Sequence, residues 1–437
     1  MKDLLSWERW RRWLVCAARL VFVVGAILAL VATADPPPED YYSHQLWDRA
    51  GGLAFDFGSW EIRALLNKAG NEWIAPQDTL TLEQRHDLVI AYMAGISQSS
   101  RLRGEINQVY SQYEETEASK EAASKEQELA NLRTWLATRQ NLVEGILEEQ
   151  VSTELEAEGF GRAGVVLPPV KIRFTPLPLL LVTSLRAEIT REGDIHLKAG
   201  IPVGEQEQLE EIVDLAFEDK RALVTPIGGL SAYPAMILEI DNLVWLVDTF
   251  AHEWTHHWLI AHPLGAHYTD SGEMTSMNET TASIVGREIG RRVILKYYPE
   301  LAEQLPPLPV PPEKPPMTGG EIVWPDEPPA DQFDYGREMR ETRLRVDELL
   351  SQGEIEEAET YMEARRQMFV ERGYNIRKLN QAYFAFYGSY ATSPSTGNPI
   401  GGQLEWLRGQ SVSLLNYLQT VARFTTHQDL LDLLPKE

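Results

Sequence analysis

The chain carries the stretch His252-Glu253-Trp254-Thr255-His256 within residues 243–260, an apolar segment whose pattern predicts one long helix. Residues four apart lie one above the other on the same helix face, so His252 and His256 can offer two imidazole nitrogens to one metal ion. Imidazole suits Zn²⁺, and a catalytic zinc has three protein ligands and an open position for water. Glu253 can reach such a water molecule and act as a general base. The stretch therefore predicts two metal ligands and a base, and it requires a third ligand elsewhere.

A second helical pattern, residues 276–297, offers the third ligand. It contains Glu279, which follows His256 with 22 residues between them. This gap lets the first helix end at Pro263-Leu264-Gly265 and lets the chain return antiparallel, because proline and glycine stop helices. We therefore expect Glu279 to lie beside the two histidines.

The two helices together resemble the gluzincin zinc metalloproteases, in which H-E-x-x-H is followed some twenty or more residues later by a ligand glutamate, often within N-E-x-x-A. Asn278-Glu279-Thr280-Thr281-Ala282 has that form, and the resemblance covers about residues 165–300. It implies that His252, His256 and Glu279 bind one catalytic Zn²⁺ and that Glu253 is the general base in hydrolysis of a peptide or protein substrate. It also implies an α+β fold, with a zincin-like catalytic domain built from a small mixed sheet and the active-site helix.

Other polar residues near the motif allow more than one interpretation. His262 follows His256 by six residues, as the third histidine of the metzincin pattern does, but residue 259 is leucine where that pattern has glycine. His262 is thus the alternative third ligand. Asp248 precedes His252 by one helical turn and either orients that histidine or is simply a polar position of the helix. His257 faces away from the expected metal and is interpreted as a supporting or structural residue.

Composition restricts the classes of partner. The chain has 437 residues, which suggests two or three domains, and its formal net charge is −25. A strongly acidic body argues against nucleic acid and anionic lipid as partners. The single cysteine, Cys16, excludes a disulfide within the chain, so the fold relies on core packing and the metal. The sequence predicts no oligomeric state.

The N-terminal segment has the features of a targeting signal. Arginines at 9, 11 and 12 precede an uninterrupted apolar run, residues 20–31, and then Ala32-Thr33-Ala34. This pattern predicts a secretory signal peptide or a single-pass signal anchor. In both cases the basic flank stays in the cytoplasm and the body crosses the membrane. We therefore expect a membrane-anchored protein with an extracytoplasmic catalytic domain, or a secreted one after cleavage.

Shifts in composition divide the rest of the chain. Thr81 and Gln84 form a capping box that predicts the start of a helix, and residues 101–158 are polar with apolar positions at helical spacing. The predicted organisation is 1–34 signal peptide or anchor, 35–160 helical region with a coiled-coil-like arm, 161–300 metallopeptidase core, 301–330 proline-rich linker, and 331–437 helical C-terminal subdomain.

The segment before the motif is predicted to be rich in strands. Residues 165–241 contain alternating and short apolar runs that suggest three to five strands and a helix near 203–217. The resemblance implies that an edge strand of this sheet holds the substrate backbone. The stretch Gly229-Leu230-Ser231-Ala232-Tyr233-Pro234 is the candidate edge, because proline within sheets is confined to edges.

A tyrosine in the C-terminal helical segment is the predicted oxyanion donor. In gluzincins a helical subdomain follows the zinc helices, and a tyrosine or histidine from it stabilises the tetrahedral intermediate. The aromatic segment 377–390 offers Tyr387 for this role, with Tyr383, Tyr390 and Tyr374 as alternatives. The competing interpretation is an aromatic helix of the core.

Two hypotheses from other classes compete with a peptidase. The first is a catalytically inactive pseudoenzyme that keeps zinc as a structural or binding device. The second is a membrane-anchored coiled-coil scaffold in which the histidine motif arose by chance. Zinc binding would exclude the scaffold, because only the peptidase and the pseudoenzyme bind zinc. Turnover that depends on Glu253 would then distinguish the peptidase from the pseudoenzyme.

Overall fold

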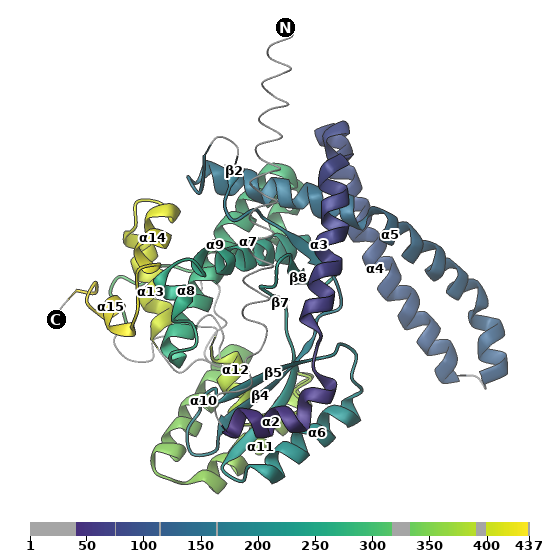
Figure 1. The fold of residues 1–437 in the computed structure, drawn as a ribbon. Coiled ribbons are helices and arrows are strands. Elements are labelled where there is room, and N and C mark those ends of the chain that lie inside the picture. The colour runs from purple at the N-terminus through teal and green to yellow at the C-terminus, as the bar shows by residue number, and fades with distance from the viewer. Residues whose placement is uncertain are drawn as a thin grey trace.

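The computed structural model describes residues 41–74, 76–112, 115–162, 165–316, 333–389 and 399–435. The fold is mixed α+β, with mostly helical structure and small sheets. Figure 1 shows one helical core around α7 and α9, a second layer below it built on the sheet β5–β4–β6, and a long hairpin formed by α4 and α5 that extends outward.

The central pair of helices corresponds to the two helical patterns of the sequence. Helix α7 spans Leu243–Leu259 and α9 spans Gly272–Tyr297, joined by the short α8, Pro263–Ala266. Asn242 caps α7 by accepting a hydrogen bond from Trp245 N, so this helix begins where the apolar pattern begins. Ser271 caps α9 through Met274 N, and α9 therefore begins four residues before the predicted position 276. Both predicted helices are confirmed.

A three-stranded sheet packs beside α7, in the order β3–β8–β7. Strand β3 (Ile172–Phe174) is parallel to β8 (Ala235–Ile237), and β7 (Gly229–Leu230) is antiparallel to β8. The prediction of an edge within residues 229–234 is confirmed, since β7 is the terminal strand. The opposite edge is covered by helix α5, because Ile172 N donates to Glu148 and Phe174 N donates to Glu144.

The second three-stranded sheet is antiparallel and lies away from α7. Its order is β5 (Gly193–Leu197), β4 (Leu179–Leu185), β6 (Lys220–Pro226). Helices α2 (Tyr41–Ala50) and α6 (Val203–Ala216) bury one face, and α12 (Gln381–Tyr387) packs on the other. A short strand β2 (Val165–Val166) pairs with β1 (Gly161–Arg162). Residues 165–241 contain seven strands, β2 to β8, rather than the three to five expected, because several are only two or three residues long.

The N-terminal helices connect the two layers and form the predicted arm. Helix α3 covers Phe57–Ile74, α4 covers Leu82–Gln112 and α5 covers Glu115–Ala157. Thr81 and Gln84 exchange the two hydrogen bonds of a capping box, as predicted. The arm is solvated at its far end, but the second half of α5 is part of the main core through Val143, Ile146, Leu147, Val151 and Leu155. Single 3₁₀ turns follow α2, α3 and α9 at Gly51–Leu53, Pro76–Thr79 and Pro299–Gln304.

The C-terminal helices divide between the two layers. Helices α10 (Tyr335–Ser351), α11 (Ile355–Glu371) and α12 build a core that reaches the β5–β4–β6 sheet. Helices α13 (Ile400–Gln410), α14 (Leu414–Val421) and α15 (His427–Leu431) pack on α9 instead. The predicted subdomain 331–437 therefore contributes to two separate cores rather than one.

Three predicted features fall outside the described residues. They are the targeting segment 1–34, residues 317–330 of the proline-rich linker and Tyr390. Among the helices that the structure describes, none combines the length and the apolar character needed to cross a membrane.

Candidate metal centre

Helices α7 and α9 approach closely because α9 presents glycines to α7. A Cβ atom on Gly286 would lie 2.8 Å from the Asp248 carbonyl oxygen, and one on Gly290 would lie 2.8 Å from Asp248 N. Any larger side chain at these positions would push the two helices apart. Glu279, Ser283, Gly286 and Gly290 follow a spacing of four, three and four residues, so they share the face of α9 that meets α7. The glycine contacts thus bring Glu279 beside the histidines.

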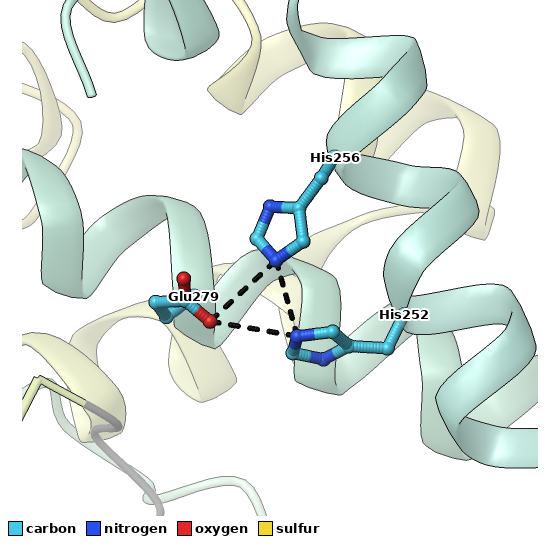
Figure 2. A group of neighbouring side chains, drawn as sticks. All are labelled: His252, His256 and Glu279. Atoms are coloured by element: carbon cyan, nitrogen blue, oxygen red, sulfur yellow. Dashed lines mark hydrogen bonds and ion pairs between the residues drawn. The ribbon is translucent and has the colours of Figure 1, made fainter. Parts of the chain in front are cut away.

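The two histidines and Glu279 form a compact triangle of ligand atoms (Figure 2). His252 Nε2 lies 3.1 Å from His256 Nε2. Glu279 Oε2 lies 3.4 Å from His252 Nε2 and 3.5 Å from His256 Nε2. His252 and His256 are one turn apart on α7, and Glu279 projects from α9 toward both. The structure therefore brings together the three residues that the sequence singled out as ligands.

This triangle matches the ligand set of a tetrahedral zinc ion. Zinc–nitrogen and zinc–oxygen distances of about 2.0–2.2 Å place neighbouring tetrahedral ligand atoms roughly 3.3 Å apart. The three separations of 3.1, 3.4 and 3.5 Å are close to that value. Two imidazole nitrogens and one carboxylate oxygen are also a ligand set that zinc prefers, and three protein ligands leave a fourth position open. The residues present therefore fit one Zn²⁺.

Each of the three side chains is held by a second contact on its other polar atom. His256 Nδ1 lies 2.8 Å from Asn278 Oδ1, and His252 Nδ1 lies 3.5 Å from Ser283 Oγ. Tyr268 donates a 2.6 Å hydrogen bond to Glu279 Oε1, so the other carboxylate oxygen, Oε2, points toward the histidines. Contacts of this kind fix the orientation of metal ligands and raise metal affinity.

The charges of the triangle stabilise one another. Burial alone would raise the pKa of Glu279, but His256 and His252 hold it well below its usual value. Burial alone would lower the pKa of His256, but Glu279, Glu253 and the hydrogen bond to Asn278 raise it to about 9. Metal-free protein therefore keeps a protonated histidine beside a carboxylate, and a metal cation can replace that proton.

Glu253 lies beside the triangle and under strand β7. It is only 5% exposed, and Ser231 donates a hydrogen bond to its Oε2. A Cβ atom on Gly229 would lie 2.2 Å from Glu253 Oε1, so only glycine allows the strand to run this close. The carboxylate predicted to act as base thus lies against the edge strand β7 and the residue that follows it.

The alternative roles of the nearby polar residues are resolved by their contacts. His262 is outside the ligand group: its Nδ1 lies 2.8 Å from the Trp258 carbonyl oxygen and its ring stacks on Trp258. His257 Nε2 contacts the Ala232 carbonyl oxygen at 2.8 Å, and burial lowers its pKa to about 4, so a neutral ring supports the turn after β7.

Asp248 lies one turn before His252. Burial raises the pKa of the Asp248 carboxyl group to about 6, although the positive charges of His252 and Arg287 oppose this shift. Among the described residues, the hydrogen-bond partner of His252 Nδ1 is Ser283 and not Asp248. Asp248 is thus within electrostatic range of His252, and its carboxylate lies against Gly286 of α9.

The structure places Tyr387 on the β5–β4–β6 sheet. Its hydroxyl group lies 2.8 Å from Thr225 Oγ1, and its ring packs on Tyr383 with centroids 4.4 Å apart. Tyr374 stacks on Tyr335, whose hydroxyl lies 3.3 Å from that of Tyr383. Within the described part of the chain, none of these phenols is hydrogen-bonded to the triangle. The oxyanion role of Tyr387 stays a prediction.

Several residues at the site were not found from the sequence. Tyr268 lies in a short connection, where no periodic pattern marks a residue as part of a site, and Ser231 was predicted only as part of the candidate edge and not as a partner of Glu253. Ser283 and the glycines of α9 do leave a signal, because G-x-x-x-G spacing is typical of closely packed helix pairs. That signal would have predicted which face of α9 meets α7.

Comparisons of this chain with protein-family models, with curated proteins and with solved structures found no match. The description of the metal centre therefore rests on the geometry and chemistry of its own residues.

Proposed function

We propose that this protein is a zinc-dependent peptidase with a zincin-like catalytic domain. The observation that carries the proposal is the triangle of His252, His256 and Glu279, with the Glu253 carboxylate beside it. When bound, zinc supplies Lewis acidity and an activated water molecule. A structural zinc site is closed by four protein ligands, whereas three ligands and an adjacent buried carboxylate favour catalysis.

Glu253 has the position that a general base requires. Its charge acts on His256, which places it within electrostatic range of the ligand set. Ser231 holds one carboxylate oxygen, so the side chain keeps one orientation during proton transfer. In peptide hydrolysis Glu253 would accept a proton from the attacking water and pass it to the leaving amine.

The two edges of the β3–β8–β7 sheet favour one path for the substrate. Helix α5 covers the β3 edge through Glu144 and Glu148, whose carboxylates accept its backbone N–H groups. The β7 edge runs next to Glu253. We propose that an extended peptide adds to β7 as a further strand, which would place its carbonyl groups beside the base.

The sequence of the N-terminal segment supports a proposal for the location of the protein. We propose that residues 1–34 direct the chain to the membrane, as a signal anchor or a cleaved signal peptide, and that the catalytic domain is extracytoplasmic. The acidic composition fits a body that does not adhere to anionic lipid.

The test is cleavage of a mixed peptide pool, followed by mass spectrometry, with the zinc-loaded full chain. We expect Glu253→Gln to keep its zinc and to lower the rate about 10²–10⁴-fold, since it removes the general base. Glu273→Gln is the matched control, because Glu273 is exposed in the first turn of α9. Zinc binding without cleavage that depends on Glu253 would indicate the pseudoenzyme instead. A chain that binds no zinc would indicate the scaffold.

A further inference from the structure

Arg191 and Asp194 form an ion pair at the turn between β4 and β5. Arg191 Nε and Nη2 both lie 2.6 Å from the same carboxylate oxygen, Asp194 Oδ2. The guanidinium also lies over the ring of Phe386 in α12, 5.8 Å from its centroid. Asp194 and Phe386 therefore hold the Arg191 side chain from two separate elements.

This pair lies on the side of the sheet opposite α2 and α6. Along β5, Ile195 and Leu197 are buried against those two helices. Because successive side chains of a strand point to opposite faces, Asp194 and His196 face the other side, which α12 also covers. His196 confirms this direction, because its ring contacts Phe57 of α3 rather than the core beneath β5.

The metal centre is within electrostatic range of Arg191. Burial alone would lower the pKa of Arg191, but the interactions with Asp194, and then with Tyr268 and Glu279, raise it. Tyr268 and Glu279 are the phenol and the carboxylate joined by the 2.6 Å hydrogen bond of the ligand triangle. The permanent cation Arg191 therefore interacts electrostatically with Glu279 of the ligand triangle.

The ion pair is surrounded by protein and still accessible. The side chains of Arg191 and Asp194 keep 25% and 29% of their surface exposed. Burial nevertheless raises the pKa of Asp194 even though Arg191 opposes that shift. Because the ion pair is partly exposed, a ligand can reach it. Because the surrounding protein screens charge poorly, the electrostatic attraction between the pair and a charged ligand is stronger than at an open surface.

Arg191 has hydrogen-bonding capacity beyond Asp194. A guanidinium carries five N–H groups, and Asp194 receives bonds from only two of its nitrogens through a single oxygen. Within the described residues, no other protein acceptor takes the Nη1 hydrogens. A planar guanidinium is suited to bind a carboxylate through two parallel bonds.

We propose that Arg191, oriented by Asp194, binds a carboxylate of the peptide substrate close to the scissile bond. The inference rests on the proposed peptidase function and names its substrate class, which is peptides with an anionic group near the cleaved bond. That group is either the C-terminal carboxylate or an acidic side chain. In a chain with a net charge of −25, a cation at this position offsets the repulsion that such a substrate would meet.

The first experiment uses two zinc-chelating probes and requires no turnover. One is a four-carbon hydroxamate that ends in a carboxylate, and the other is its methyl ester. Binding of each to the zinc-loaded full chain is measured by isothermal titration calorimetry. We expect the carboxylate probe to bind at least about tenfold more tightly, the effect of one charge-assisted hydrogen-bonded pair.

Variants assign that preference to Arg191. Arg191→Met should bind both probes equally, with the affinity for the ester unchanged, and Arg191→Lys should keep part of the preference. Arg345→Met is the matched control, because Arg345 pairs with Glu348 three residues away on an exposed face. Equal affinity of the unmodified protein for both probes would overturn the proposal, and so would a preference that survives in Arg191→Met. If neither probe binds, the proposed zinc site is contradicted. That result differs from equal binding of both probes, which contradicts only the role of Arg191.

A second experiment distinguishes the two sources of the carboxylate. Peptides of one sequence, with a free or amidated C-terminus and with Glu or Gln near the middle, compete with the hydroxamate for zinc-loaded Glu253→Gln. Weaker competition by the amidated peptides would identify the C-terminus, and weaker competition by the Gln peptides would identify a side chain. No difference in either comparison would overturn the proposal.

Discussion

Two pairs of buried glutamates in this molecule have different kinds of partner. Glu144 and Glu148 of α5 are 0% and 5% exposed, and the Lys68 ammonium lies 2.6 Å and 2.8 Å from them. Glu253 and Glu279 of the metal centre are 5% and 7% exposed, and their partners are hydroxyl groups and imidazoles. The first pair is neutralised by permanent cations, because Lys171 also pairs with Glu148 and Arg173 with Glu144. In the second pair, Glu279 lies against two imidazoles, which can exchange a proton for a metal ion.

The comparison teaches that burial of carboxylates does not by itself indicate a functional site. Glu144 and Glu148 also accept the N–H groups of β3, so their hydrogen-bonding capacity is used within the fold. Glu279 keeps one oxygen directed at two histidine nitrogens. A buried carboxylate with titratable partners is suited to bind metal, and one with lysine and backbone partners is suited to hold elements together.

The largest expected effect is on the structural pair. Lys68→Met should lower the free energy of unfolding by about 3–5 kcal/mol, because it removes the buried cation that both carboxylates share and leaves them only the less buried Arg173 and Lys171. The folded fraction should still bind zinc. Chemical denaturation and zinc analysis of the same preparation provide the measurement. Arg345→Met should change stability by less than about 0.5 kcal/mol. A loss below about 1 kcal/mol in Lys68→Met would contradict the contrast between the two pairs.

The next effect concerns the contact that brings Glu279 to the histidines. Gly286→Ala would place a Cβ atom 2.8 Å from the Asp248 carbonyl oxygen, so α7 and α9 must separate. We expect a loss of about 1–3 kcal/mol in stability together with weaker zinc binding. Gly204→Ala in α6 is the control, because nothing lies within 4 Å of its added Cβ atom. Unchanged zinc affinity in Gly286→Ala would show that the helix contact does not position the ligands.

A smaller effect is expected at the phenol that holds Glu279. Tyr268→Phe removes the 2.6 Å hydrogen bond to Glu279 Oε1 and should weaken zinc binding about 10–100-fold. Competition with a chromophoric chelator measures the affinity. Tyr298→Phe removes a phenol that bonds Gln150 far from the metal centre, and it should leave zinc affinity unchanged. Equal affinities in the two variants would mean that Tyr268 does not orient the ligand.

The smallest effect is the dependence of zinc binding on pH. In metal-free protein the pKa of His256 is raised from 6.5 to about 9. Protonated His256 stabilises the folded, metal-free protein. This stabilisation is fully present below pH 6.5 and is lost as the pH rises through 9. Zinc must displace that proton, so its affinity should increase about tenfold per pH unit between those values. Calorimetry in buffers of different ionisation enthalpy measures the proton release, and zinc binding that releases no proton at pH 7 would contradict the charge state assigned to His256.

The grouping of His252, His256 and Glu279 could be predicted from the sequence because their spacing is local. His252 and His256 are fixed by one helix, and Glu279 is fixed by the helix that returns from the Pro263-Leu264-Gly265 turn. Helix starts were predictable for the same reason, since a cap such as Thr81 acts within three residues.

The remaining features depend on pairings between distant residues. Glu144 and Glu148 belong to a polar helix that resembles a solvated arm, and only Lys68 and strand β3 reveal that they are buried. Tyr387 lies in an aromatic segment whose packing partner, Thr225, is 162 residues away. No pattern within either segment encodes such a contact.

The most direct test of the central claim is the zinc content of the purified full chain and of two variants. The metal centre predicts one zinc per chain in the unmodified protein, a similar value in Glu273→Ala, and a lost or greatly weakened zinc in Glu279→Ala. Glu273 and Glu279 lie on the same helix, but only Glu279 faces the histidines. An unmodified protein that binds no zinc after metal is added, or a Glu279→Ala variant that binds zinc as tightly, would contradict the account.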